Sequence, residues 1–132
     1  MSSRDRLPLA LFVLRISVFV VMLMWTIDKL IYPVHASRVY EKFYGITGFE
    51  IYYFYAIGIA ELALLLAFLV GYKKRFTYGL VLLFHAVSTF SSYEQYMDPF
   101  SQPNLLFFAA WPMLGACFTL YYLRAYDTKL VV

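Results

Sequence analysis

Long runs of apolar residues, separated by short polar segments, dominate the pattern of this chain. Four of the runs are long enough to cross a hydrocarbon core of about 30 Å as helices that rise about 1.5 Å per residue. The expected spans cover approximately residues 7–32, 49–71, 76–97 and 104–125. The pattern therefore predicts an all-α integral membrane four-helix bundle, with residues 1–132 forming a single four-span transmembrane domain.

The connections between the spans set the expected orientation. Residues 33–48 (PVHASRVYEKFYGITG) mix apolar and charged side chains, a pattern typical of a short amphipathic helix on a membrane surface, although a plain loop also fits. The next turn is very short and contains Lys73, Lys74 and Arg75. Because basic residues in short loops stay on the cytoplasmic side, we expect both termini to be cytoplasmic and the 33–48 segment to lie on the outer face.

Composition supports a membrane protein and excludes several other classes. The chain is 63% hydrophobic and 14% charged, against about 45–50% and 25% in a typical globular domain. Cys117 is the single cysteine, so an intrachain disulfide and a multi-cysteine metal site are excluded, and no metal site is predicted. The basic residues flank the apolar runs, so nucleic acid is not an expected partner. Membrane lipids, together with other membrane subunits or a homo-oligomer, are the expected partners.

Glu61 lies within the apolar stretch AIGIAELALLLAFLVG. A charge at such a site costs at least about 2.5–3.5 kcal/mol, so it normally has a partner, a wet cavity or a bound proton. Counted from the cytoplasmic ends of the spans, Arg15 is about 12 Å deep, and Glu61 and His85 are about 15 Å deep. We therefore expect a buried polar cluster of these three residues, in which Arg15 pairs with Glu61. The pair is either functional or purely structural.

Polar residues continue from this cluster towards the outer surface. On the third expected span they recur at spacings of three and four, and so share one helix face. The predicted polar seam consists of Thr26, Lys29, Ser88, Thr89, Ser92, Glu94 and Gln95. Lys29 and Glu94 could pair at its outer end. The hydroxyl groups could bond to helix backbone and join neighbouring helices, or the seam could be hydrated and accessible to a ligand.

Three pieces of the sequence carry a resemblance to a known family. LRISVFVVMLMWTIDKL has Arg15 early in the first span and Lys29 near its end, and AELALLLAFLVGYKKR joins Glu61 to a glycine and a basic turn. NLLFFAAWPMLGA fits the layout of the fourth span. With these pieces, over most of its length, the chain resembles the DoxX-like family of small four-span membrane proteins. The resemblance implies a four-helix bundle in a bacterial or archaeal cytoplasmic membrane, with links to quinone-coupled sulfur oxidation and oxidative-stress complexes. We expect the bacterial cytoplasmic (inner) membrane.

These observations favour a non-catalytic function. We expect a membrane subunit or accessory protein of a larger redox-linked assembly, whose buried cluster accepts a lipid or quinone head group. No resident cofactor is predicted, because the chain lacks a cysteine constellation and a histidine pair for haem. One alternative is a small proton-linked transporter that acts as an oligomer, in which Glu61 and His85 titrate. A second alternative is a membrane oxidoreductase that acts on quinone.

Overall fold

The computed structural model describes residues 3–31, 38, 41–42, 51–101 and 104–131, and within these residues the chain is helical without strands. The predicted outer-face segment lies largely outside the described residues. The elements, in chain order, are α1 (Ser3–Ile31), α3 (Ile51–Leu69), α4 (Lys74–Ser91), α5 (Tyr93–Met97), η1 (Asn104–Ala109), α6 (Ala110–Tyr122) and η2 (Arg124–Tyr126).

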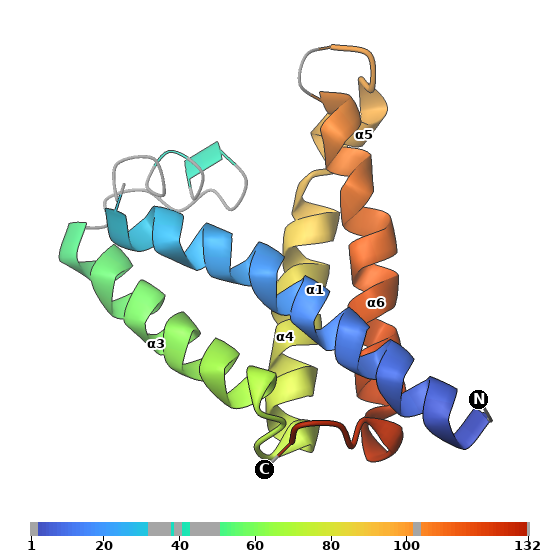
Figure 1. Ribbon diagram of the computed structural model, residues 1–132. Coiled ribbons are helices and arrows are strands. Elements are labelled where there is room, and N and C mark those ends of the chain that lie inside the picture. The colour runs from blue at the N-terminus through green and yellow to red at the C-terminus, as the bar shows by residue number, and fades with distance from the viewer. Residues whose placement is uncertain (1–2, 32–37, 39–40, 43–50, 102–103, 132) are drawn as a thin grey trace.

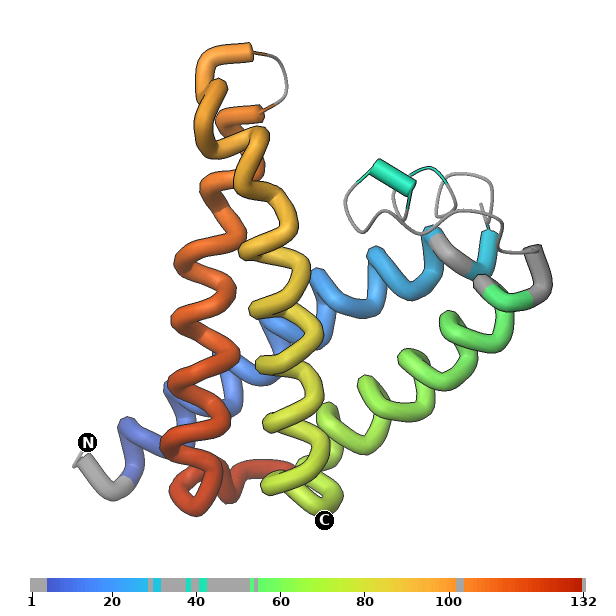
Figure 2. The backbone as a smooth tube through the Cα atoms, turned by 180° about the vertical axis from the view of Figure 1, so that it is seen from behind, coloured from blue at the N-terminus to red at the C-terminus, as the bar shows by residue number. Residues whose placement is uncertain are grey.

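The long helices form two pairs. α1 packs along α3, and α4 packs along α6. The two pairs lie close together where α3 leads into α4 and spread apart towards their other ends, as both views show (Figures 1 and 2). We call the end of the molecule where α3 leads into α4 the closed end. The C-terminal part of the chain also lies there, beside the start of α4 (Figure 1).

A glycine cap produces the turn at the closed end. Gly71 has a left-handed backbone with φ 69°. Its N–H bonds to the carbonyl of Phe68 at 3.1 Å, and the N–H of Tyr72 bonds to the carbonyl of Ala67 at 2.9 Å. This pair of bonds is the Schellman motif, which ends helices at glycine because a side chain disfavours positive φ. The cap terminates α3 and lets α4 begin within a few residues.

The core lies between the helix pairs near the closed end. The buried apolar side chains are Leu11, Val18, Leu65, Phe68, Tyr78, Val81, Cys117 and Leu120. Elsewhere large apolar side chains point outward along the helices, including Ile59, Phe90 and Leu106, which are 62%, 62% and 75% exposed. Among the described residues, the segments Asp5–Asp28 and Asn104–Tyr122 are long and apolar enough to cross a membrane.

The fourth apolar run is not one uniform helix. It begins as the 3₁₀ helix η1 and continues as α6, which places Pro112 in the first turn of the α-helix. A proline is tolerated at that position because the first N–H groups of a helix have no intrahelical partner. The irregularity of the helix near Trp111 is therefore a change from 3₁₀ to α-helix, just before Pro112.

Candidate functional site

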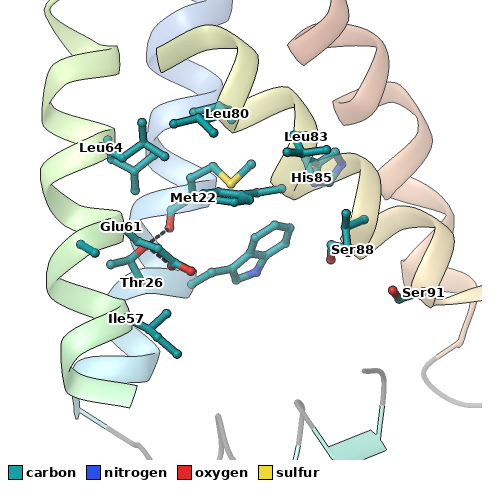
Figure 3. Close-up of a pocket in the computed structure, with 16 residues that line it drawn as sticks. Met22, Thr26, Ile57, Glu61, Leu64, Leu80, Leu83, His85, Ser88 and Ser91 are labelled. Carbon is teal, nitrogen blue, oxygen red and sulfur yellow. Dashed lines mark hydrogen bonds between the residues drawn. The ribbon is translucent and has the colours of Figure 1, made fainter. Parts of the chain in front are cut away.

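A cavity of about 1020 Å³ lies between the two helix pairs, lined by α1, α3 and α4 (Figure 3). Most of its lining is apolar or aromatic. Its polar lining residues are Thr26, Glu61, His85, Ser88 and Ser91. The structure thus brings four of the predicted site residues to one cavity, Thr26 from α1, Glu61 from α3, and His85 and Ser88 from α4. Volumes of about 300–1,000 Å³ are typical of sites for small molecules, so this cavity has room for one.

Thr26 joins α1 to the carboxylate on α3. Its hydroxyl lies 3.3 Å from Oε2 of Glu61 and 3.0 Å from the backbone carbonyl of Met22. Thr26 is buried, whereas Glu61 is half-buried and faces the cavity in Figure 3. The carboxylate of Glu61 therefore sits at the edge of the cavity, with a hydroxyl group of the neighbouring helix beside it.

His85 connects three helices. Its Nε2 lies 3.0 Å from the carbonyl of Ala110 in α6, and its ring stacks on Trp25 of α1 with ring centroids 6.0 Å apart. A carbonyl only accepts hydrogen bonds, so Nε2 carries the proton. Nδ1 of His85 is buried and has no hydrogen-bond partner within the described part of the chain. His85 therefore fixes the α4–α6 pair and forms one wall of the cavity.

The predicted ion pair between Arg15 and Glu61 is wrong. Nη1 of Arg15 lies 2.8 Å from Oδ1 of Asp127, and both side chains are fully buried. The error lies in the register of the helices. Because Thr26 is opposite Glu61 in an antiparallel pair, Arg15 is displaced from that level by eleven residues, or about 16 Å along α1. At that distance it lies at the closed end of the molecule.

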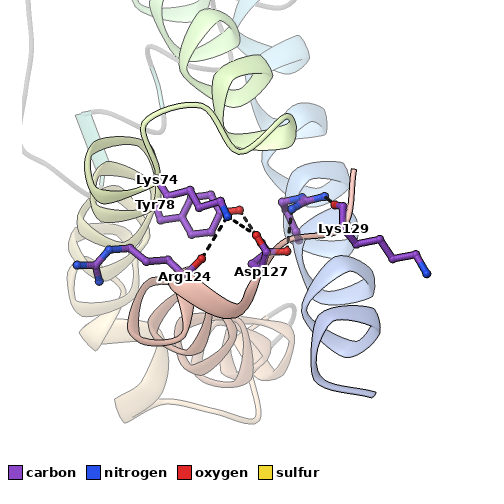
Figure 4. A network of polar contacts seen from close by, with 6 residues as sticks. Lys74, Tyr78, Arg124, Asp127 and Lys129 are labelled. Atoms are coloured by element: carbon purple, nitrogen blue, oxygen red, sulfur yellow. Dashed lines mark hydrogen bonds and ion pairs between the residues drawn. The ribbon is translucent and has the colours of Figure 1, made fainter. Parts of the chain in front are cut away.

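Asp127 is the centre of a second polar cluster (Figure 4). Tyr78 donates a hydrogen bond to its Oδ2 at 2.5 Å, and Nη2 of Arg15 donates to the backbone carbonyl of Lys129 at 2.5 Å. The ammonium group of Lys74 donates to the backbone carbonyls of Asp127 and of Arg124. Burial lowers the pKa of Lys74, which the charge of Asp127 partly offsets.

Sequence reasoning missed Asp127 because it follows the last expected span. One signal could have found it. It is the sole acidic residue in the segment 99–132, and it lies at the same end of the bundle as Arg15. A buried arginine near that end requires an anion, and the charge of Asp127 is the one that the C-terminal segment supplies.

The residues of the predicted polar seam do not form one continuous surface in the structure, since among its described side chains only Thr26 and Ser88 line the cavity. Thr89 donates to the backbone carbonyl of His85 at 2.8 Å, and Ser92 donates to that of Ser88 at 3.2 Å. These two hydroxyls are therefore used within their own helix. Gln95 is buried and Glu94 is exposed. The side chain of Lys29 lies outside the described part of the structure, so its pairing with Glu94 stays a prediction.

Two further features of the described residues concern Gly115 and metal binding. Gly115 in α6 is exposed, and no atom lies within 4 Å of the position that an added Cβ would take. Within the described ranges, no group of three or more His, Cys, Asp or Glu side chains could hold a metal ion.

Comparison with known proteins gives no relative. No family model matches the chain, and no curated protein or solved structure matches it. The resemblance to DoxX-like proteins therefore stays a prediction, and the function has to be argued from the two polar sites.

Proposed function

We propose that this chain is a DoxX-like, four-span subunit or accessory protein of a redox-linked assembly in the bacterial cytoplasmic membrane, with both termini cytoplasmic. Its cavity holds the polar head group of a lipid or a quinone. The observation that carries this proposal is the position of Glu61, Thr26 and Ser88 on the wall of an otherwise apolar cavity between two helix pairs.

The exposed apolar side chains support a membrane location. Ile59 on α3, Phe90 on α4 and Leu106 on η1 each leave more than half of their surface uncovered. A soluble monomer rarely exposes large contiguous apolar patches, whereas helices in a bilayer do so by necessity. The same apolar faces can also pack against other membrane subunits.

The chemistry of the cavity supports an amphiphilic ligand. Apolar side chains of all three helices, such as Leu64 and Leu83, can cover a hydrocarbon or ring system (Figure 3). Hydroxyl groups both donate and accept hydrogen bonds, so Ser88 and Ser91 can meet either the carbonyls of a quinone or the head group of a lipid. The arrangement binds and orients such a molecule without needing a catalytic step.

A transporter is the second candidate. Glu61 and His85 are both titratable and line the same cavity, which favours a proton-linked carrier. In that case the protein would act as an oligomer. Proton uptake by reconstituted vesicles in response to an imposed substrate gradient would favour this candidate over the accessory role.

Purification in mild detergent, followed by mass spectrometry of the co-purified proteins and lipids, tests the proposal. Ser88→Phe places a large ring in the cavity, whereas Val13→Phe adds bulk at an exposed site on α1 and serves as the control. We expect the same bound amphiphile in the wild type and in Val13→Phe, and its loss from Ser88→Phe. Co-purification of the same amphiphile with all three proteins, or of no amphiphile with any of them, would contradict ligand binding in the cavity. Purification without other subunits would contradict the accessory role.

A further inference from the structure

The C-terminal tail, residues 123–131, crosses the closed end of the molecule (Figures 1 and 4). It starts after α6, includes η2, and reaches the turn between α3 and α4. There it packs directly on Gly71, since a Cβ added to Gly71 would lie 2.7 Å from Cγ1 of Val131. The tail therefore contacts the segment that joins the two helix pairs.

The carboxylate of Asp127 is held by both helix pairs at once. Arg15 of α1 bonds to one of its oxygens at 2.8 Å, and Tyr78 of α4 bonds to the other at 2.5 Å. α1 belongs to one pair and α4 to the other. Both donors are buried side chains on long helices. The ring of Phe12 supports the Arg15 guanidinium, 5.4 Å from the ring centroid.

Asp127 supplies the side-chain hydrogen bonds that join the tail to α1 and α4. The further hydrogen bonds that Arg15 and Lys74 donate to the tail go to the backbone carbonyls of Lys129, Arg124 and Asp127, which any residue would supply. The side chains that follow, at Thr128, Lys129 and Leu130, are exposed. One buried carboxylate therefore provides the charged attachment of the tail to α1 and α4, beside the apolar contact of Val131 with Gly71.

From this geometry we infer that Arg15 and Tyr78 form a carboxylate-binding site on the helices, occupied by the chain's own Asp127, and that the C-terminal tail is a releasable strap. The strap holds the two helix pairs together at the closed end. A buried guanidinium without a counter-charge is strongly unfavourable, so a small carboxylate should enter the site when that of Asp127 is removed. Releasing the strap removes this link between α1 and α4, two of the helices that line the cavity.

Chemical rescue tests the inference. Thermal unfolding of the purified full chain in detergent is measured for the wild type, Asp127→Gly and Arg15→Met/Asp127→Gly, with sodium formate or with sodium chloride at the same ionic strength. We expect Asp127→Gly to lower the Tm and formate to restore part of the loss. The double variant should gain nothing from formate beyond the effect of chloride. Asp98→Gly removes an exposed carboxylate outside this site and serves as the control, with no specific response to formate.

Two results would overturn the inference. One is an unchanged Tm in Asp127→Gly, and the other is a formate effect that is absent or is independent of Arg15. If Asp127→Gly does not fold, hydrogen exchange of the wild-type protein tests whether the tail opens separately from the helices. The N–H groups of Tyr126 and Asp127, which bond to carbonyls within the tail, should exchange faster than those of α4 around Tyr78. Exchange of the tail N–H groups and of the α4 N–H groups at one common rate would show that the tail opens only on global unfolding, and would overturn the inference. None of these readouts requires a cavity ligand, so they are independent of the proposed function.

Discussion

The hydroxyl of Thr26 on α1 lies 3.3 Å from the carboxylate of Glu61 on α3, and this contact marks the register of the first helix pair. In that register Arg15 falls at the closed end, where it pairs with Asp127. The chain therefore has two separate polar centres. One lines the cavity between the helix pairs, and the other fastens the C-terminal tail across them.

The pair of Arg15 and Asp127 should show strong energetic coupling. Asp127→Asn leaves a buried guanidinium without its counter-charge, and breaking such pairs costs about 3–5 kcal/mol in the free energy of unfolding. The double variant Arg15→Met/Asp127→Leu removes both charges and should recover much of that loss. Equilibrium unfolding in detergent micelles measures both effects.

Glu61 provides the control for this cycle. Because Glu61 on α3 is level with Thr26, about 16 Å along α1 from Arg15, the effects of Glu61→Gln and Arg15→Met should add to within about 0.5 kcal/mol. A coupling energy well above that value between Arg15 and Glu61, with none between Arg15 and Asp127, would contradict the observed register. It would support the ion pair of Arg15 and Glu61 that the sequence predicted.

Two substitutions at His85 separate the roles of its nitrogens. In His85→Gln the side-chain amide N–H can replace Nε2 as donor to the carbonyl of Ala110, whereas the shorter side chain of His85→Asn cannot reach it. The asparagine variant should therefore be less stable than the glutamine variant by about 0.5–1.5 kcal/mol, the net value of a hydrogen bond. Equal stabilities of the two variants would show that the contact with Ala110 contributes nothing.

Two glycines offer a matched comparison. Gly71→Ala places a side chain at φ 69° and against Val131, so it should destabilise the protein by at least about 1–2 kcal/mol. Gly115 lies in α6 with open space around it, and Gly115→Ala should be neutral or stabilising by up to about 1 kcal/mol. The difference in Tm between the two variants measures the effect. A smaller loss for Gly71→Ala than for Gly115→Ala would contradict the glycine cap and the position of the tail.

Orientation in the membrane can be tested by labelling with a membrane-impermeant thiol reagent. Cys117 is buried and can be replaced by serine to give a cysteine-free background. In intact cells, a cysteine at Lys42 should be labelled and one at Lys73 should not, because the basic turn is expected to be cytoplasmic. The opposite pattern would reverse the proposed topology, and labelling of both sites would argue against a membrane-spanning arrangement.

The apolar pattern predicted the long helices well, because burial and span length leave a strong signal in sequence. The first expected span, 7–32, corresponds to α1 at Ser3–Ile31, and the second ends close to the cap at Gly71. Helical spacing also placed His85 and Ser88 on one side of α4, where both line the cavity. These features depend on local periodicity, which a single sequence displays.

The partner of Arg15 could not be predicted in the same way. The depth estimate treated the cytoplasmic ends of the spans as level, whereas α1 begins earlier and crosses α4 and α6 obliquely (Figure 1). The return of the tail to the closed end is a tertiary contact between residues 112 positions apart. No periodic pattern records such a contact, and so the pairing with Asp127 emerged only from the structure.

Fluorescence of Trp25 can report directly on ligand binding in the cavity, because this tryptophan lines the cavity and Trp111 is not among its lining residues. The Trp111→Phe variant, in which Trp25 is the remaining tryptophan, is titrated in detergent with a benzoquinone that carries a decyl chain. The Trp25→Phe variant, which keeps Trp111, is the control. We expect saturable quenching of Trp25 that Ser88→Phe abolishes, and only weak, linear quenching of Trp111. Linear quenching of equal strength for both tryptophans would contradict quinone binding in the cavity.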